Sequence, residues 1–85
     1  MTTVAKHYKQ SESDFYCTGC GKKGCPIFRK KGQERPSGHL KKLYCIFCQA
    51  EVNHVEIRPV GKYTYQDFLD EFNAGVFVNG ERVYR

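Results

Sequence analysis

The chain has 85 residues and a formal net charge of +5, from 14 basic and 9 acidic residues. A single domain of this length buries too little apolar surface to be stable without a disulfide, a metal or a similar constraint. No stretch approaches the roughly 18 apolar residues of a membrane span, and residues 1–6 lack the apolar segment of a signal peptide. We therefore expect a cytoplasmic protein with reduced thiols and no membrane partner.

The chain begins with two stretches of different character. Residues 1–14 are polar and show no hydrophobic period, which predicts a flexible N-terminal arm. Residues 15–60 form the unit that a metal would organise. Within it, extended stretches at 26–30, 39–44 and 51–58 predict about three strands, with turn composition at 32–38 and Pro59 closing the last strand.

Two Cys-x-x-Cys pairs lie in this unit, with 24 residues between them. Each pair can present two thiolates from one tight turn, and two such turns complete a tetrahedral Cys₄ zinc site. Gly21 after the first pair tolerates the positive φ that such a turn uses, whereas Gln49 after the second pair fits less well. The sequence therefore predicts one Zn²⁺ with four ligands: Cys17, Cys20, Cys45 and Cys48.

Cys25 is the fifth cysteine. It is either a small buried hydrophobic residue or a replacement for Cys20 in the ligand set, and the two-residue spacing favours Cys20. A disulfide framework is the alternative for the whole set. Secreted domains of that kind usually hold an even number of cysteines, so five favour the metal.

Residues 61–85 predict a helix and a β-hairpin that pack on the ribbon. Thr64 and Asp67 follow the capping-box pattern, with Asp in place of Glu, and Gly75 suits the end of the helix. Asn79-Gly80 between two short apolar runs indicates a type I′ hairpin. The apolar residues of the helix recur at helical spacing: Tyr65, Phe68, Leu69 and Phe72. We thus expect a small, metal-organised α+β fold, an antiparallel zinc ribbon of about three strands with a short C-terminal helix and a β-hairpin.

The two turns resemble the rubredoxin-like knuckles of the zinc-ribbon family. The matching segments are Tyr16-Cys17-Thr18-Gly19-Cys20-Gly21 and Leu43-Tyr44-Cys45-Ile46-Phe47-Cys48. Residues 38–45 and 53–57 are also similar to small uncharacterised proteins of Gram-positive bacteria and their phages. The resemblance covers about half of the chain and does not reach the tail. It implies a metal and a fold, and more loosely a transcription-related or phage accessory role, because zinc ribbons serve many such proteins.

Basic residues are concentrated between positions 22 and 42, where eight of them face a single acid, Glu34, for a net charge of +7. They are Lys22, Lys23, Arg29, Lys30, Lys31, Arg35, Lys41 and Lys42. Lysine and arginine contact phosphates, and the neighbouring Phe28, Tyr44 or Phe47 can stack on unpaired bases. The pattern therefore favours binding of nucleic acid, DNA or RNA, through the first hairpin of the ribbon.

Two other interpretations of this charge remain open. The lysines can simply keep a long loop soluble, with the aromatic residues taken up by the core. Alternatively, the chain is a protein–protein interaction module that docks on an acidic surface and modulates a host complex such as RNA polymerase.

Enzyme activity is not expected. Asn53-His54 beside a zinc ribbon is similar to metal-dependent nucleases with a catalytic histidine, but that chemistry needs further metal ligands on the following helix, and residues 65–73 hold no histidine. Four cysteine ligands also leave zinc without an open position to activate water. We therefore expect no small-molecule substrate. His54 is interpreted as an ordinary surface or edge residue and His39 as a residue that can rest against the basic loop, so neither is expected to be catalytic.

Overall fold

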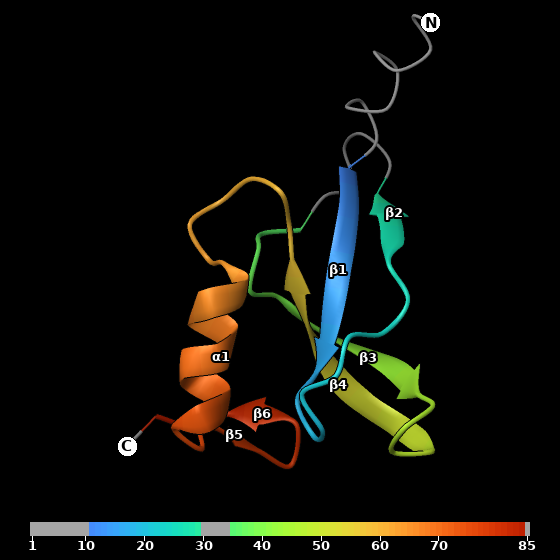
Figure 1. Ribbon diagram of the computed structural model, residues 1–85, viewed down its shortest axis with the longest axis vertical. Coiled ribbons are helices and arrows are strands. Elements are labelled where there is room, and N and C mark those ends of the chain that lie inside the picture. The colour runs from blue at the N-terminus through green and yellow to red at the C-terminus, as the bar shows by residue number, and fades with distance from the viewer. Residues whose placement is uncertain (1–10, 30–34, 85) are drawn as a thin grey trace, which may run out of the picture.

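The computed structural model describes residues 11–29 and 35–84. Its centre is a four-stranded antiparallel sheet in the order β2-β1-β4-β3. The strands are β1 (Ser11–Cys17), β2 (Ile27–Arg29), β3 (Leu40–Cys45) and β4 (Ala50–Ile57). Helix α1 (Tyr65–Asn73) stands beside the sheet, and the short hairpin of β5 (Phe77–Val78) and β6 (Glu81–Arg82) lies next to the end of the helix (Figure 1).

Strand β1 is the main difference from the sequence prediction. About three strands were expected, and the principal sheet has four because β1 pairs with both β2 and β4. The predicted arm over 1–14 is therefore wrong for residues 11–14, while residues 1–10 lie outside the described residues. Ser13 explains the error, because it is a buried polar residue whose hydroxyl donates to the buried carboxylate of Glu56. A polar residue at an inward position hides the alternation that marks a strand.

The helix begins as the sequence predicts. Thr64 Oγ1 accepts a hydrogen bond from the Asp67 N–H at 3.3 Å, and the Asp67 carboxylate accepts one from the Thr64 N–H at 2.8 Å. This reciprocal pair is the predicted capping box. Gly75 follows the C-cap residue with a φ of 75°, as expected for the end of a helix.

The C-terminal segment after β4, called the tail below, contacts the sheet through both its helix and its hairpin. The fully buried Phe68 of α1 lies against Tyr16 of β1, with ring centroids 5.4 Å apart. In the hairpin, Asn79 and Gly80 both have positive φ, 54° and 82°, which is the type I′ geometry that Asn-Gly predicts. Asn53 of β4 donates through Nδ2 to the Gly80 carbonyl at 2.6 Å, so the hairpin is also tied to the sheet.

The register separates the two faces of the sheet. Residues directly opposite each other on neighbouring strands point to the same face. His54 lies opposite both Cys17 and Lys41, so these three share one face. Tyr16 and Val55 are opposite each other on the other face, which α1 covers through Phe68. In the described part of the chain, α1 is too short to cross a membrane.

Candidate metal centre

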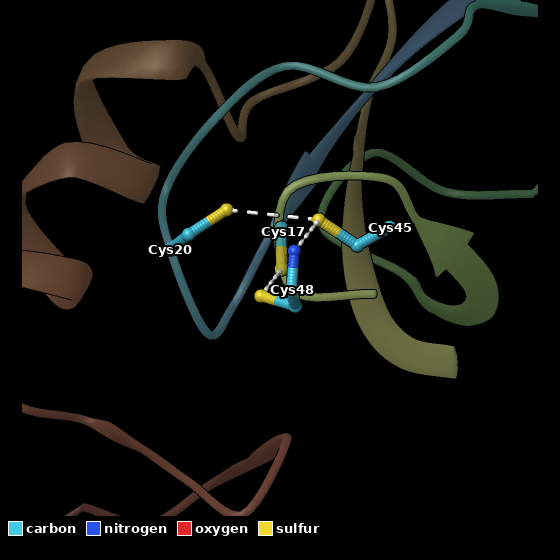
Figure 2. A group of neighbouring side chains, drawn as sticks. All are labelled: Cys17, Cys20, Cys45 and Cys48. Carbon is cyan, nitrogen blue, oxygen red and sulfur yellow. Dashed lines mark hydrogen bonds between the residues drawn. The ribbon is translucent and has the colours of Figure 1, made fainter. Parts of the chain in front are cut away.

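Four thiols from two turns meet at one end of the sheet. Cys17 ends β1 and Cys20 lies in the turn after it, while Cys45 ends β3 and Cys48 lies in the turn before β4. Figure 2 shows the side chains pointing toward one another from these turns. All four sulfur atoms lie within 4.8 Å of one another. The Cys17–Cys48 and Cys20–Cys45 sulfur pairs are each 3.7 Å apart, and the four thiols could hold a metal ion.

The two turns share one backbone geometry. The Gly21 N–H donates to the Cys17 carbonyl at 2.8 Å, and the Gln49 N–H donates to the Cys45 carbonyl at 2.7 Å. Gly21 and Gln49 occupy the same place in their turns, with φ of 77° and 57°. The second turn therefore forms in spite of Gln49, whose side chain makes this left-handed conformation less favourable than it is for glycine.

Backbone N–H groups point at two of the sulfurs. The Gly19 N–H is 3.2 Å from Cys17 Sγ, and the Cys48 N–H is 3.3 Å from Cys45 Sγ. Burial acts to raise the pKa of the Cys45 thiol. Hydrogen bonds from the backbone of Cys48 and Phe47, and a further one from the thiol of Cys20, outweigh burial and lower that pKa to about 7. This sulfur therefore reaches the thiolate form, which binds metals, near neutral pH.

The thiols of Cys17 and Cys48 are harder to ionise than that of Cys45, because their pKa values are raised. Burial raises the pKa of the Cys17 thiol. The pKa of Cys48 rises to about 12, chiefly because its thiol lies beside the sulfurs of Cys17 and Cys45. Since neighbouring negative charges oppose ionisation, a cation between the sulfurs would favour the thiolate forms that bind metals.

Cys25 lies outside this cluster. Its side chain is exposed, and the second thiol of the first turn belongs to Cys20 and not to Cys25. The spacing rule that favoured Cys20 agrees with this geometry, because a two-residue separation keeps both sulfurs in one turn.

The basic residues that the structure describes do not all lie on one face. Lys41 and Lys42 are neighbours on β3 and point to opposite faces, Lys41 beside His54 and Lys42 beside Asn53. Lys23 makes an ion pair with Asp14, with 3.5 Å between Nζ and Oδ1. Lys22 and Arg35 are exposed. Three of the predicted contacts lie outside what the structure describes: the side chain of Arg29, and all of Lys30 and Lys31.

The aromatic residues between the cysteine pairs are not taken up by the core. Phe28, Tyr44 and Phe47 are 62%, 61% and 53% exposed, so the alternative that placed them in the core is wrong. The buried apolar positions belong instead to the strands and the helix: Phe15, Cys17, Cys45, Val55 and Phe68. Lys22 Nζ lies 4.5 Å from the centroid of the exposed Phe47 ring, a cation–π contact.

The interpretation of His54 as a surface or edge residue is also wrong. His54 is 1% exposed because β4 is an inner strand, paired with β1 on one side and β3 on the other. Its Nδ1 lies 2.7 Å from the Val52 carbonyl oxygen. A single histidine in a polar strand gives no sequence signal for burial, since the burial arises from strand order.

Comparison with protein-family models, curated proteins and solved structures gives no significant match to the chain. The likeness to zinc ribbons therefore rests on the spacing of the cysteines and on the geometry of their cluster.

Proposed function

We propose that the chain is a non-enzymatic zinc-ribbon module that binds nucleic acid. Zn²⁺ would be held by Cys17, Cys20, Cys45 and Cys48. Tetrahedral zinc with Zn–S bonds of about 2.3 Å separates its ligand sulfurs by about 3.8 Å. The sulfur atoms of the Cys17–Cys48 and Cys20–Cys45 pairs, each 3.7 Å apart, already have nearly that separation.

A structural role for the metal follows from the donor set. Catalytic zinc sites keep a position for water or substrate, whereas four thiolates fill the tetrahedral shell. The metal would instead join the turn after β1 to the turn between β3 and β4. It would thereby fix the segments next to those turns, including Lys22 and Phe47, relative to each other.

The contact between Lys22 and Phe47 is the observation that carries the binding function. An exposed ammonium group lies over a ring that is itself half-exposed, so one surface offers a cation and an aromatic face together. Phosphates pair with such cations and bases stack on such rings. Lys41, on the same face of the sheet as His54, adds a further positive charge on that side of the molecule.

A protein partner is the second candidate. Ile46 beside Phe47 is 70% exposed, and an exposed apolar residue in a turn suits a protein contact. In this candidate the chain modulates a host complex such as RNA polymerase. The transcription-related or phage accessory role that the zinc-ribbon resemblance implies belongs with nucleic-acid binding. Capture of one dominant partner that survives nuclease treatment would favour a protein partner over nucleic acid.

Salt dependence tests the nucleic-acid proposal. Affinity of the zinc-loaded protein should fall with salt, with a log–log slope of about −0.9 per phosphate contacted on duplex or −0.7 on single strands. Lys22→Glu should weaken binding to every sequence and reduce the slope by about one contact. Lys62→Glu makes the same charge change on an exposed lysine outside the basic stretch and should leave the slope unchanged.

A variant with several charge reversals tests the other lysines between positions 22 and 42. Joint reversal of Lys30, Lys31, Lys41 and Lys42 should abolish most binding while the zinc content stays the same, because lysines fix the phosphate backbone without taking part in the fold. Absence of binding to any DNA or RNA at low salt would refute the proposal.

A further inference from the structure

A small groove lies next to the cysteine cluster on the side of the molecule that carries His54. It has a volume of about 300 Å³ and is bounded by two segments, residues 22–26 after the first turn and residues 44–47 in the second. His54 of β4 also lines it. Ligand pockets in proteins run from about 300 to 1,000 Å³, so this groove suits one small flat group.

The groove has an aromatic and apolar wall. Tyr44, Ile46 and Phe47 line it, and all three are exposed where small domains usually bury such side chains. Lys22, on the opposite segment, reaches over the Phe47 ring. The groove therefore presents ring faces for stacking with a positive charge at their edge.

A polar acceptor is available among these apolar groups. The Val52 carbonyl can only accept a hydrogen bond, so Nδ1 of His54 carries the proton that it donates at 2.7 Å. Nε2 of the neutral ring is then an acceptor. Within the described residues, the hydrogen bond to Val52 is the one that the His54 ring makes, although the side chain is almost fully buried. Nε2 is thus free to receive a donor from a group in the groove.

We propose that this groove seats an unpaired base of a single-stranded nucleic acid. The inference rests on the proposed nucleic-acid function and names the form of the ligand. The base stacks on the aromatic wall of Tyr44 and Phe47, an N–H of the base donates to His54 Nε2, and Lys22 pairs with the adjacent phosphate. Each of the four bases carries such an N–H group and a π-face, so the site tolerates any sequence.

The charge of the surroundings favours this occupant. Lys22 and Lys23 line the groove and none of its lining residues is acidic, which complements a polyanion and disfavours a basic peptide. A duplex does not fit the same site, because its bases are stacked inside and must first be unpaired to reach a side pocket. The groove thereby predicts a preference for single strands that lysines alone do not predict.

The test compares strands that differ only in their bases. Fluorescence anisotropy would measure binding of the zinc-loaded protein to oligothymidylate of about 15 nucleotides, to an abasic strand with the same phosphates, and to a duplex of the same length. We expect oligothymidylate to bind most tightly. Loss of one stacked base weakens binding by about 5- to 150-fold. The abasic strand should therefore bind at least about 5-fold more weakly than oligothymidylate.

Phe47→Ala identifies the groove as the place of stacking. It should weaken binding to oligothymidylate by a similar factor. Binding to the abasic strand should change little, because the only effect there is that Lys22 loses its contact with the ring. Phe28→Ala is the comparison, since Phe28 is a similarly exposed phenylalanine on β2 that can also stack on bases but lies outside the groove, and its loss should weaken binding less than the loss of Phe47. Zinc content and circular dichroism of both variants should equal those of the parent protein, because neither ring is in the core.

The outcomes separate this inference from the function on which it rests. Equal affinity for the abasic and thymidine strands, or equal losses from Phe47→Ala and Phe28→Ala, would overturn the base site while phosphate binding stands. Absence of binding to all three probes would overturn both. A protein partner whose capture needs Phe47 while no oligonucleotide binds would also overturn both, and would assign the groove to protein recognition.

Discussion

Gly21 has two physical reasons to be glycine. Its φ is 77°, and a Cβ built there would lie 3.1 Å from Cζ of Phe72 in α1. Gly75 shares the first reason, with a φ of 75°, but a Cβ there would meet nothing within 4 Å. Alanine at either position should cost the roughly 1–2 kcal/mol of a left-handed conformation.

The pair of glycines isolates the contact between the first turn and the helix. Gly21→Ala should cost about 1–3 kcal/mol more than Gly75→Ala, because it adds overpacking against Phe72. Urea unfolding of the zinc-loaded variants measures both values. Equal costs would show that the Phe72 ring moves aside without penalty, and that the helix is only loosely held against the turn.

Glu71 gives the tail a dependence on pH. Its carboxylate accepts hydrogen bonds from the hydroxyls of Tyr63 and Tyr84 and from Nε of Arg82. Burial acts to raise the pKa of Glu71, but these three donors lower it below the ordinary 4.5. A carboxyl with a lowered pKa in the folded state stabilises the fold above its unfolded pKa, and this contribution is lost as the pH falls through the folded value.

Glu71→Gln should therefore be less stable than the parent protein at neutral pH. The difference should shrink as the pH falls below about 4.5, because the parent carboxylate then becomes protonated as well. Urea unfolding of both proteins over a pH series measures it, and acid release of zinc, which affects both, cancels in the difference. A difference that stays constant through this range would show that the charge of Glu71 does not stabilise the fold.

At the scale of elements, α1 is held by its aromatic face. Phe68 is fully buried, and its ring centroid lies within 6.2 Å of those of four other rings. They are Tyr16 of β1, Tyr65 and Phe72 of α1, and Phe77 of β5. Because these contacts join three elements, Phe68 is the residue on which the docking of the tail depends most.

Phe68→Ala should cost about 3–5 kcal/mol in the free energy of unfolding, the usual range for a core phenylalanine. Phe28→Ala, which removes an exposed ring, should change it by no more than about 0.5 kcal/mol. Chemical unfolding of both variants in the presence of zinc provides the comparison. A loss below about 1 kcal/mol for Phe68 would mean that α1 is not part of the cooperative unit.

Elements with local signals could be predicted from the sequence. The capping box of Thr64 and Asp67 and the hairpin at Asn79-Gly80 each depend on residues within four positions, and the structure has both. Each Cys-x-x-Cys pair is local in the same sense. Strand β1 was missed because its burial depends on Glu56, 43 positions away along the chain, whose carboxylate accepts from Ser13.

The candidate binding surface was less predictable for a related reason. Clustering of basic residues along the sequence does not specify a patch, since Lys41 and Lys42 alternate across the sheet. The groove joins residues 22–26, residues 44–47 and His54, which only the strand order β2-β1-β4-β3 brings together. Pairing between distant strands leaves no periodic trace in the sequence, so neither the groove nor the burial of His54 could be read from it.

At the scale of the whole molecule, we expect stability to depend on the cysteine cluster. The buried apolar residues in the described part of the chain number five, and two of them, Cys17 and Cys45, belong to the cluster. Without a metal, only Phe15, Val55 and Phe68 remain as an apolar core, alongside the buried polar Glu56 and His54. Structural zinc contributes about 10–16 kcal/mol in small domains, which equals or exceeds the roughly 5–15 kcal/mol by which whole proteins are stable.

Removal of the metal should therefore unfold the protein. Native mass spectrometry should show one zinc per chain, and a strong chelator should abolish both that species and the folded circular dichroism spectrum. Cys17→Ser and Cys48→Ser should have the same effect as the chelator, whereas Cys25→Ser, which changes an exposed thiol outside the cluster, should keep zinc and fold. Retention of zinc by Cys20→Ser together with its loss from Cys25→Ser would contradict the ligand set. Since the same two turns position Lys22 and Phe47, unfolding of the metal-free chain should also abolish the proposed binding of single strands.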